Sequence, residues 1–366
     1  MKAVVLHGVG DVACTTVPDP QLEAPTDAIV EVTATAICGA DLFPFHGLTP
    51  DFEAGTVLGH EFAGVVAELG PEVEGIRPGQ RVVNASMISD GTCLACRAGR
   101  PTQCPGRALF GYSGVYPRLD GGQAELVRVP NAGRTLQVLP DAVSDDAAVF
   151  LADVLPTAYI AVGRCDLPPD PFVCVVGCGP VGLTTVLCAL PLAKRVLCVD
   201  GVPARRDLAE RLGAEAVAPE EAEEAVAAAT EGQGADAVIE AAGSPAALGL
   251  ALRLVRGRGI VSVVGAHFEL DYPLDNALMF ERELTLRFSI GDPTNDRGHL
   301  LAELASGRLD PTPVLTHRLP LDAAAEAYRL FDTREATKVL LDPNASTEPL
   351  PPGASSPYGL GAPVGD

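Results

Sequence analysis

The chain has 366 residues, of which 47% are hydrophobic and 20% charged, and these values are typical of a globular protein with room for two domains. Its formal net charge of −22 argues against a nucleic-acid partner, because nucleic-acid phosphates would be repelled. No apolar run is long enough to span a bilayer, and the first ten residues lack a basic region followed by a long apolar core, so we expect a cytoplasmic protein without a membrane partner.

Cysteine spacing singles out two groups in the first half. Ten cysteines without a secretion signal indicate thiols and metal ligands rather than disulfides. Cys38 is followed at a distance by His60 and Glu61. A thiolate, an imidazole and a carboxylate form a donor set that suits Zn²⁺.

The second group lies in residues 90–104, which we call the cysteine loop. Its candidate ligands are Asp90, Cys93, Cys96 and Cys104. Tight Cys-x2-Cys spacing on a loop is typical of a closed, structural zinc site, and an aspartate oxygen is a competent zinc ligand. The alternative is an empty loop with three free thiols.

An apolar strand at 173–176 runs directly into G-x-G-x-x-G, formed by Gly177, Gly179 and Gly182. The first glycine allows a tight turn, the second lets the backbone approach a pyrophosphate, and the third lets helix and strand pack closely. Pro180 and Val181 belong to the same loop, and the helix over 183–192 turns its N-terminus towards the phosphates. A purely structural glycine-rich turn is the alternative.

A second strand, 195–199, ends at Asp200, 18 residues after Gly182. An acidic side chain in this place accepts hydrogen bonds from ribose hydroxyls and repels a 2′-phosphate, so we expect NAD(H) rather than NADP(H). Arg205 is close enough in sequence to contact the cofactor and weaken this preference.

The next elements continue the alternation of strand and helix. The pattern predicts helices at 203–212 and 219–231 and strands at 214–218, 235–240, 260–265 and 284–290. Together they form a six-stranded, doubly wound parallel sheet of the Rossmann type. Gly243 and Gly265 lie at carboxyl ends of strands and are candidate backbone contacts on the nicotinamide side. Beyond this sheet, helices are expected at 297–306 and 322–331 and a strand at 337–341.

At these residues the chain resembles the zinc-dependent medium-chain dehydrogenase/reductase family. The resemblance covers residues 1 to about 343 and includes, besides the cysteine loop and the glycine-rich fingerprint, the segments MKAVVLHGVGDV, ICGADL, VLGHEFAGVVAELG, GIRPGQRVV and GGQAELVRVP. It implies an α/β protein with a GroES-like β-barrel catalytic domain at 1–154, a Rossmann dinucleotide-binding domain at 155–294 and a return to the catalytic domain at 295–343. The tail at 344–366 is rich in Pro, Gly and Ser, and we expect it to be mobile.

The resemblance also implies the ligands of a catalytic zinc. In the formaldehyde-dehydrogenase-like branch, an aspartate in the place of Asp153 is the third protein ligand beside Cys38 and His60. Glu61 is adjacent and able to enter the coordination sphere. Three protein ligands and an open position are the layout of a catalytic zinc, although a family member that has lost its zinc is an alternative. Family members are usually homodimers or homotetramers.

The sequence departs from the family where the alcohol proton is handled. The family's Ser or Thr two residues after the zinc cysteine is replaced by Ala40, and its His five residues after that cysteine is replaced by Phe43. His46 is either a substitute for the missing relay or a solvated loop side chain. Phe43 and Phe45 are expected to make the cleft apolar and to favour a bulky substrate.

Three functions follow from these patterns. The leading hypothesis is a zinc-dependent oxidoreductase that transfers hydride between NAD(H) and an alcohol, aldehyde or ketone. The second is a reductase of an iminium (C=N) or conjugated C=C bond on the same fold, which Ala40 and Phe43 permit. The third, a non-catalytic dinucleotide sensor, fits poorly with an open metal site. All three hypotheses imply a small-molecule ligand, and the first two a small-molecule substrate.

Overall fold

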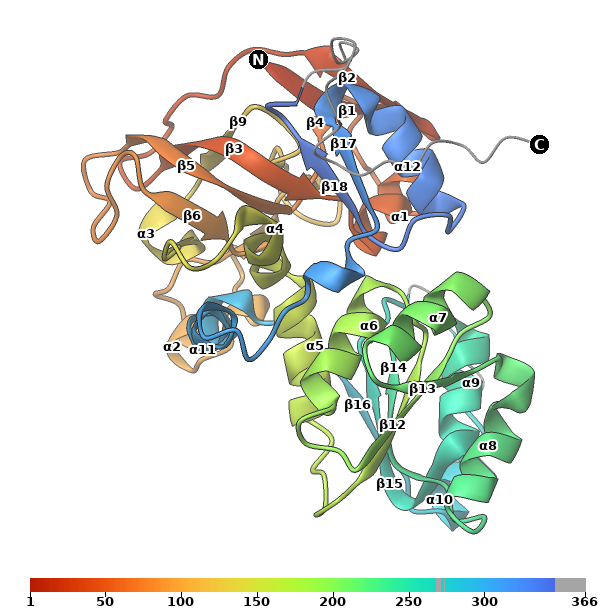
Figure 1. Cartoon of the computed structure of the whole chain (residues 1–366). Coiled ribbons are helices and arrows are strands. Elements are labelled where there is room, and N and C mark those ends of the chain that lie inside the picture. Colours follow the sequence, from red (N-terminus) through yellow and green to blue (C-terminus); the bar gives the residue numbers. More distant parts are fainter. Residues whose placement is uncertain (268–270, 273, 346–366) are drawn as a thin grey trace, which may run out of the picture.

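The computed structural model describes residues 1–267, 271–272 and 274–345, so the expectation of a mobile tail at 344–366 falls almost wholly outside the described residues. Two lobes are visible in Figure 1. The first contains the N-terminal segments and the last described ones, and the second contains the middle of the chain. Helix α5 (Val154–Gly163) lies between them, and α11 (Pro293–Ala305) lies beside α2 (Leu94–Arg97) at the lower left of the first lobe.

The first lobe is built on a seven-stranded sheet with β3 near its centre. The sheet order is β10-β6-β5-β3-β18-β17, and β9 also pairs with β3. A separate sheet has the order β2-β1-β4, and β7 pairs with β8. The strands of this lobe are β1 (Lys2–Gly8), β2 (Asp11–Thr16), β3 (Ala28–Ala36), β4 (Thr56–Val57), β5 (Glu61–Leu69), β6 (Arg81–Asn84), β7 (Met87–Ile88), β8 (Ala108–Leu109), β9 (Leu126–Val129), β10 (Leu136–Val138), β17 (His317–Pro320) and β18 (Val339–Asp342).

The last strands return to this sheet from beyond the second lobe. Strand β18 pairs antiparallel with β3, with Leu340 opposite Ala36, and β17 pairs in parallel with β18. The backbone N–H of Ile37 donates to the carbonyl oxygen of Val339 at 3.0 Å. The short helices of this lobe are α1 (Leu42–Phe45), α2 (Leu94–Arg97), α3 (Ala132–Thr135), α4 (Asp145–Ala148) and the amphipathic α12 (Ala324–Asp332).

The second lobe is the predicted six-stranded parallel sheet. Its order is β13-β12-β11-β14-β15-β16, and every neighbouring pair is parallel. The order reverses between β11 and β14, which creates the crevice where doubly wound sheets bind ligands. Its elements are β11 (Phe172–Val176), α6 (Pro180–Ala189), β12 (Arg195–Val199), α7 (Pro203–Arg211), β13 (Glu215–Val217), α8 (Ala222–Ala229), β14 (Ala235–Glu240), α9 (Pro245–Leu254), β15 (Val255–Val263), α10 (Asn276–Glu281) and β16 (Thr285–Phe288).

Element boundaries differ from the expected ones where a cap or a turn decides them. Helix α6 begins at Pro180, three residues earlier than predicted, because proline fits the first helical turn. Helix α11 begins at Pro293 rather than 297, because the Asp292 side chain accepts a hydrogen bond from the Asn295 N–H and caps the helix. Strand β15 begins at Val255, directly after α9, rather than at 260. Strand β17 was not predicted.

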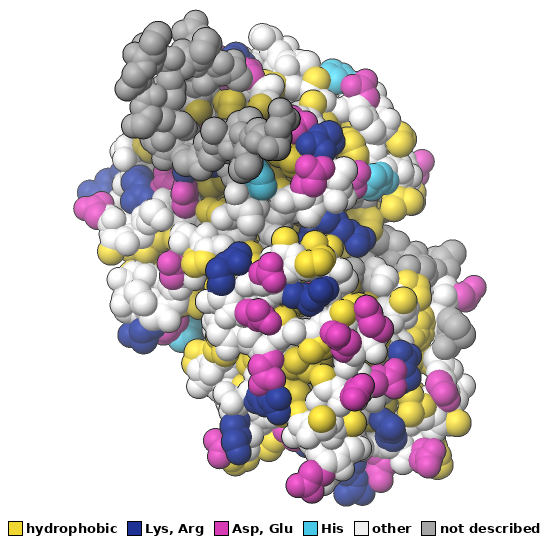
Figure 2. All heavy atoms as spheres, turned by 45° about the vertical axis from the view of Figure 1, so that its right-hand side comes forward, with side chains coloured by type: hydrophobic (Ala, Val, Ile, Leu, Met, Phe, Trp, Pro, Cys, Tyr) yellow, Lys and Arg dark blue, Asp and Glu magenta, His cyan; other side chains and the backbone are white. Residues whose placement is uncertain are grey.

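The surface charge and the hydropathy of the helices can be followed in the structure. On the face shown in Figure 2, acidic and basic side chains are interspersed, and no continuous basic patch is visible. Among the described helices, no single one is long and apolar enough to cross a membrane; one bent pair, 145–152 with 154–163, meets the length and composition criteria.

Candidate active site

The structure brings Cys38, His60, Glu61 and Asp153 together. Cys38 follows β3, His60 and Glu61 stand at the start of β5, and Asp153 immediately precedes α5. One ligand atom from each of the four residues lies within 4.8 Å of all the others. The Asp153 Oδ2 atom is 3.8 Å from Cys38 Sγ and 3.5 Å from His60 Nε2. Four donors from three distant segments therefore converge on one point.

The donor atoms fit a divalent cation. His60 and Glu61 are almost completely buried, and neither His60 Nε2 nor Glu61 Oε1 makes a hydrogen bond to any described residue. Buried polar atoms are nearly always satisfied, so these two unpartnered atoms fit a bound ligand. Thiolate, imidazole and carboxylate are the donor types that zinc prefers.

Burial and neighbouring charges shift the pKa values of side chains in the cluster. Burial raises the pKa of the Cys38 thiol, and the nearby Glu61 carboxylate raises it further. Burial likewise raises the pKa of Glu61, although the Lys338 ammonium opposes this effect. A bound cation reverses this balance, because it stabilises the deprotonated forms that serve as ligands.

A second layer of side chains surrounds three of the four donors. The buried Asp41 places its Oδ1 atom 3.1 Å from His60 Nδ1, while its Oδ2 atom accepts from the Cys38 N–H at 3.0 Å. Ser86 donates its hydroxyl to Asp153 Oδ1 at 3.2 Å. Asp41 lies within the segment ICGADL, but its role was not foreseen; the signal was an acid three residues after a zinc-type cysteine.

Lys338 is the other site residue that the sequence did not reveal. Its ammonium pairs with Glu61 Oε2, and the two side chains are 1% and 0% exposed. Lys338 immediately precedes β18, so this pair depends on the return of the chain to β3. A buried carboxylate without such a partner would be strongly destabilising.

The residues at the relay positions have other contacts. The Tyr112 hydroxyl donates to the carbonyl oxygen of Ala40. His46 Nε2 lies 2.8 Å from Asp332 Oδ1, and its side chain is 44% exposed, which fits the solvated-loop alternative better than a relay. The Phe45 ring packs against Tyr328 in the core of the first lobe, with ring centroids 5.6 Å apart, so the expected apolar lining depends mainly on Phe43.

The cysteine loop forms a second group of donors. The ligand atoms of Asp90, Cys93, Cys96 and Cys104 also lie within 4.8 Å of one another. Asp90 Oδ1 accepts from the backbone N–H groups of Thr92 and Cys93 at 2.7 and 2.8 Å, which lowers the pKa of Asp90. Asp90 Oδ2 is 3.2 Å from Cys104 Sγ, so one oxygen organises the loop and the other faces the thiols.

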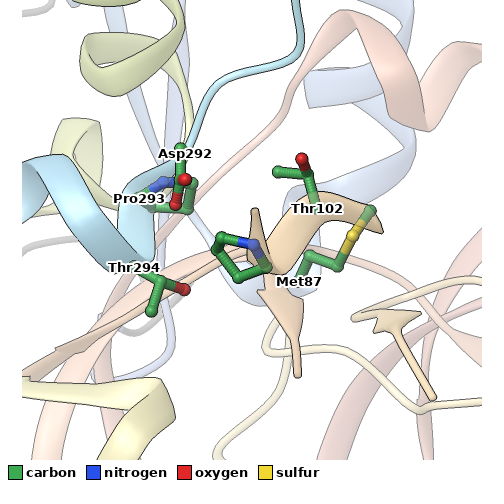
Figure 3. A pocket seen from close by; sticks show the side chains of 6 residues that line it. Met87, Thr102, Asp292, Pro293 and Thr294 are labelled. Atoms are coloured by element: carbon green, nitrogen blue, oxygen red, sulfur yellow. The ribbon is translucent and has the colours of Figure 1, made fainter. Parts of the chain in front are cut away.

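A small hollow separates the cysteine loop from α11 (Figure 3). It is lined by Met87, Pro101 and Thr102 on one side and by Asp292, Pro293 and Thr294 on the other. The Asn295 side-chain amide donates to the Gly99 carbonyl oxygen at 3.0 Å and joins the two elements. None of the eight candidate metal ligands lines this hollow, so it belongs to the packing of the loop rather than to either metal group.

The glycine-rich loop has the geometry that its three glycines predict. Gly177 has φ +97°, and a Cβ there would lie 2.8 Å from Ala242. A Cβ on Gly182 would lie 1.7 Å from the Gly177 carbonyl oxygen, so helix and loop touch. A Cβ on Gly179 would meet nothing within 4 Å. The open side of the loop is therefore at Gly179, at the N-terminus of α6, where a pyrophosphate would approach.

Asp200 connects this loop to the end of β12. Its Oδ2 atom accepts from the Cys178 N–H at 2.7 Å and its Oδ1 atom from the Val202 N–H at 2.8 Å. Arg205 lies nearby, and its buried Nε atom has no hydrogen-bond partner in the described part of the chain. Gly243 and Gly265 stand where the turns after β14 and β15 touch: a Cβ on Gly243 would lie 2.6 Å from the Ala266 carbonyl oxygen.

Comparisons with known proteins agree with this geometry. Residues 24–141 match the model of the alcohol dehydrogenase GroES-like domain, and residues 180–306 match that of the zinc-binding dehydrogenases. A relative described as a probable zinc-binding alcohol dehydrogenase of Mycobacterium tuberculosis is 38% identical over 341 residues, covering 93% of this chain and 87% of its own.

Solved structures show the same similarity. An alcohol dehydrogenase from Thermus sp. ATN1 superposes with a TM-score of 0.89 at 39% identity and covers 93% of this chain and 99% of its own. A protein from E. coli CFT073 described as a short chain alcohol dehydrogenase, complexed with NADH, has a TM-score of 0.83 at 27% identity, with 93% and 99% covered.

Proposed function

Because the chain belongs to the zinc-binding alcohol dehydrogenases of the medium-chain dehydrogenase/reductase family, we propose that it transfers hydride between NAD(H) and an alcohol or its carbonyl product at Cys38, His60 and Asp153. One observation carries the proposal: three donor side chains converge, and the buried His60 Nε2 has no hydrogen-bond partner in the described residues. An aspartate as third ligand favours the formaldehyde-dehydrogenase-like branch. The apolar Phe43 favours a substrate larger than formaldehyde.

The surrounding residues prepare the metal ligands. Zinc held by these three side chains supplies Lewis acidity to the substrate oxygen. Asp41 Oδ1 lies 3.1 Å from His60 Nδ1, which leaves Nε2 as the ring nitrogen next to Asp153. Ser86 holds Asp153 Oδ1, which leaves Oδ2 for the metal. Lys338 compensates the charge of Glu61, whose unpartnered Oε1 atom is close enough to act as an alternative ligand.

The second lobe contains the residues that we propose bind the cofactor. NAD(H) contributes the carbon that accepts or donates hydride. The loop at Gly177, Gly179 and Gly182 and the N-terminus of α6, with Pro180 and Val181, fit the pyrophosphate. Asp200 fits the adenosine ribose, and Gly243 and Gly265 fit the nicotinamide side. Arg205 remains a proposed contact near the ribose.

The missing relay supports a second candidate function. Ala40 and Phe43 offer neither a hydroxyl nor an imidazole, so an alcohol proton has to leave through solvent or through the nearby carboxylates. Reduction of an iminium or of a conjugated C=C bond does not require this relay for an alcohol proton. Steady-state assays with NAD⁺ and primary alcohols, against NADH with aldehydes, enones and cyclic imines, separate the two. Turnover of imines or enones with no turnover of alcohols or aldehydes would replace the first proposal by the second.

Restoring the relay is expected to accelerate alcohol oxidation. In the wild type, we expect oxidation of simple alcohols to be slow at pH 7 and to rise steeply with pH, because solvent must take the proton. General-base assistance contributes about 10²–10⁴-fold, so the double variant Ala40→Thr/Phe43→His should gain at least about tenfold at pH 7. The measurement is kcat against pH for both proteins. Fast wild-type oxidation of small alcohols with a flat pH profile would contradict it.

We propose that the cysteine loop holds a structural zinc through Asp90, Cys93, Cys96 and Cys104. Elemental analysis of metal-replete protein should then give about two zinc per chain. Asp90→Cys should raise resistance to chelators without changing kcat, because a fourth thiolate replaces a weaker oxygen ligand. A single zinc per chain would reject the assignment.

We also propose a cytoplasmic homo-oligomer, dimer or tetramer, with the domain division given above. Strand β16 is the outer strand of its sheet, and near it Phe280 and Phe288 are 88% and 56% exposed. Large exposed apolar side chains beside an unpaired strand edge favour association. Light scattering that gives the mass of one chain at micromolar concentration would contradict the proposal.

A further inference from the structure

Glu240 is a buried acid that neither metal group uses. It is the last residue of β14, at the carboxyl end that borders the crevice between β11 and β14, and it is 0% exposed. Its Oε1 atom accepts from the Ala242 and Gly243 N–H groups at 2.9 and 2.7 Å. Its Oε2 atom lies 3.0 Å from His267 Nε2. Burial of a carboxylate costs free energy, so we expect Glu240 to position the groups that it contacts.

The chemistry of the pair sets the orientation of the imidazole. An ionised carboxylate only accepts hydrogen bonds, so Nε2 of His267 carries the proton that faces Glu240. In the neutral ring, Nδ1 is then an acceptor. The side chain of His267 is 14% exposed, and its ring lies edge-on to Phe288 with centroids 6.5 Å apart. No other histidine occurs between residues 155 and 292.

The turns that follow β14 and β15 make close backbone contacts with each other. The N–H groups of Val264 and Gly265 donate to the Glu240 carbonyl oxygen at 2.9 and 3.0 Å. A Cβ on Gly265 would lie 2.7 Å from Glu240 Oε2. The turns after β14 and β15 are thus in close contact, and His267 follows the second of them.

A series of contacts connects the carboxyl ends of β15 and β16 to the metal cluster. Beside His267, Phe288 ends β16, and three residues later Gly291 packs so closely on Thr157 that a Cβ there would lie 2.2 Å from the Thr157 hydroxyl. The Thr157 N–H donates to the Asp153 carbonyl oxygen at 3.0 Å in the first turn of α5. The carboxyl ends of β15 and β16 therefore border the helix that begins at Asp153.

The two halves of the sheet indicate which part of the cofactor lies near His267. Asp200 follows β12, the second strand of the half formed by β11, β12 and β13, and is the proposed partner of the adenosine ribose. His267 follows β15, the second strand of the half formed by β14, β15 and β16. Each half of a doubly wound sheet receives one mononucleotide of a dinucleotide. The equivalent place in the second half therefore faces the nicotinamide nucleotide.

We propose that His267, positioned by Glu240, hydrogen-bonds the hydroxyls of the nicotinamide-side ribose of NAD(H). The inference rests on the proposed binding of the cofactor. It adds a side chain to a region of the site for which only the backbone at Gly243 and Gly265 was proposed. Glu240 acts as a positioning residue and His267 as a cofactor contact.

The test compares three ligands by calorimetry on the full chain. ADP lacks the second ribose, ADP-ribose contains it, and NADH contains both the ribose and the nicotinamide. His267→Phe keeps a ring against Phe288 but removes both nitrogens, and should weaken NADH and ADP-ribose by about tenfold while leaving ADP unchanged. His267→Gln keeps a donor for Glu240 and an acceptor for the ribose, and should stay within about threefold of wild type. His7→Ala, at an exposed position of β1, is the control.

The outcomes separate the inference from the proposal beneath it. Unchanged affinity for all three ligands would overturn the inference, and so would a loss confined to NADH, which would place the contact on the base. An equal loss for all three in both His267 variants would also overturn it, since the residue would then only stabilise the lobe. A wild-type protein that binds neither NADH nor ADP would instead overturn the proposed cofactor site.

Discussion

Replacing Cys38 with alanine is expected to lower kcat/KM by at least about a thousandfold and to leave a folded protein that still binds NADH. The loss follows because removal of the metal withdraws several kcal/mol of charge stabilisation, and every 1.4 kcal/mol is about tenfold in rate. Cofactor binding survives because Cys38 belongs to neither of the two hydrophobic clusters that cover the faces of the parallel sheet in the second lobe. The measurements are zinc content, kcat/KM and NADH affinity; His60→Ala should behave in the same way.

Cys14→Ala is the matched control for this experiment. Cys14 lies in β2 and belongs to neither group of metal ligands, so zinc content and activity should not change. Near wild-type activity in Cys38→Ala would show that zinc is not the electrophile. The second candidate function, reduction of a C=N or C=C bond, would then gain support.

Replacing Asp200 with glycine is expected to lower the preference for NAD(H) over NADP(H) by about 10–100-fold in kcat/KM. Hydrogen bonds to a charged group contribute about 1.5–3 kcal/mol, and the same carboxylate repels a 2′-phosphate. Arg205 stands close by with an unpartnered Nε atom, so positive charge is already present for a phosphate. Parallel kinetics with both cofactors measure the effect.

Asp200→Asn separates the effect of the negative charge from the effect of the hydrogen bonds that Asp200 makes to the loop. Asp200 also accepts from Cys178 and Val202, so glycine removes two loop contacts together with the charge. Asparagine keeps one carbonyl oxygen and the size of the side chain. It should therefore reproduce most of the change in preference with a smaller loss of affinity. A wild-type enzyme that already prefers NADP(H) would show that the role given to Asp200 is wrong.

The sequence was most informative where function constrains spacing. The fingerprint from Gly177 to Asp200 predicted the parallel sheet, because each of its residues is required by a local turn or by a phosphate contact. The cysteine loop is local as well, so its four candidate ligands could be grouped from spacing alone. Asp153, by contrast, was found only through the family resemblance, because nothing local distinguishes it from any other helix-starting acid.

The supporting layer could not be predicted from spacing. Lys338 is 277 residues from Glu61, and only the return of β18 to β3 brings them together. Tyr112 reaches Ala40 from a turn in which Gly111 packs against Leu58 and Gly59, and no periodic pattern reveals this contact. Short strands such as β17 lack enough residues to show an alternation, so the first lobe was recognisable as a family barrel but not strand by strand.

The position of β17 and β18 also sets an order of events during synthesis. Strands β11 to β16 are contiguous in the chain, so the nucleotide-binding lobe can fold as soon as it has left the ribosome. The other lobe must wait for residues 338–342: until they emerge, the edge of β3 at Ala36 has no β18 partner and Glu61 has no cation beside it. Open strand edges and unpaired buried charges favour aggregation and misfolding. We therefore expect a nascent chain to acquire affinity for a dinucleotide well before it can retain a metal.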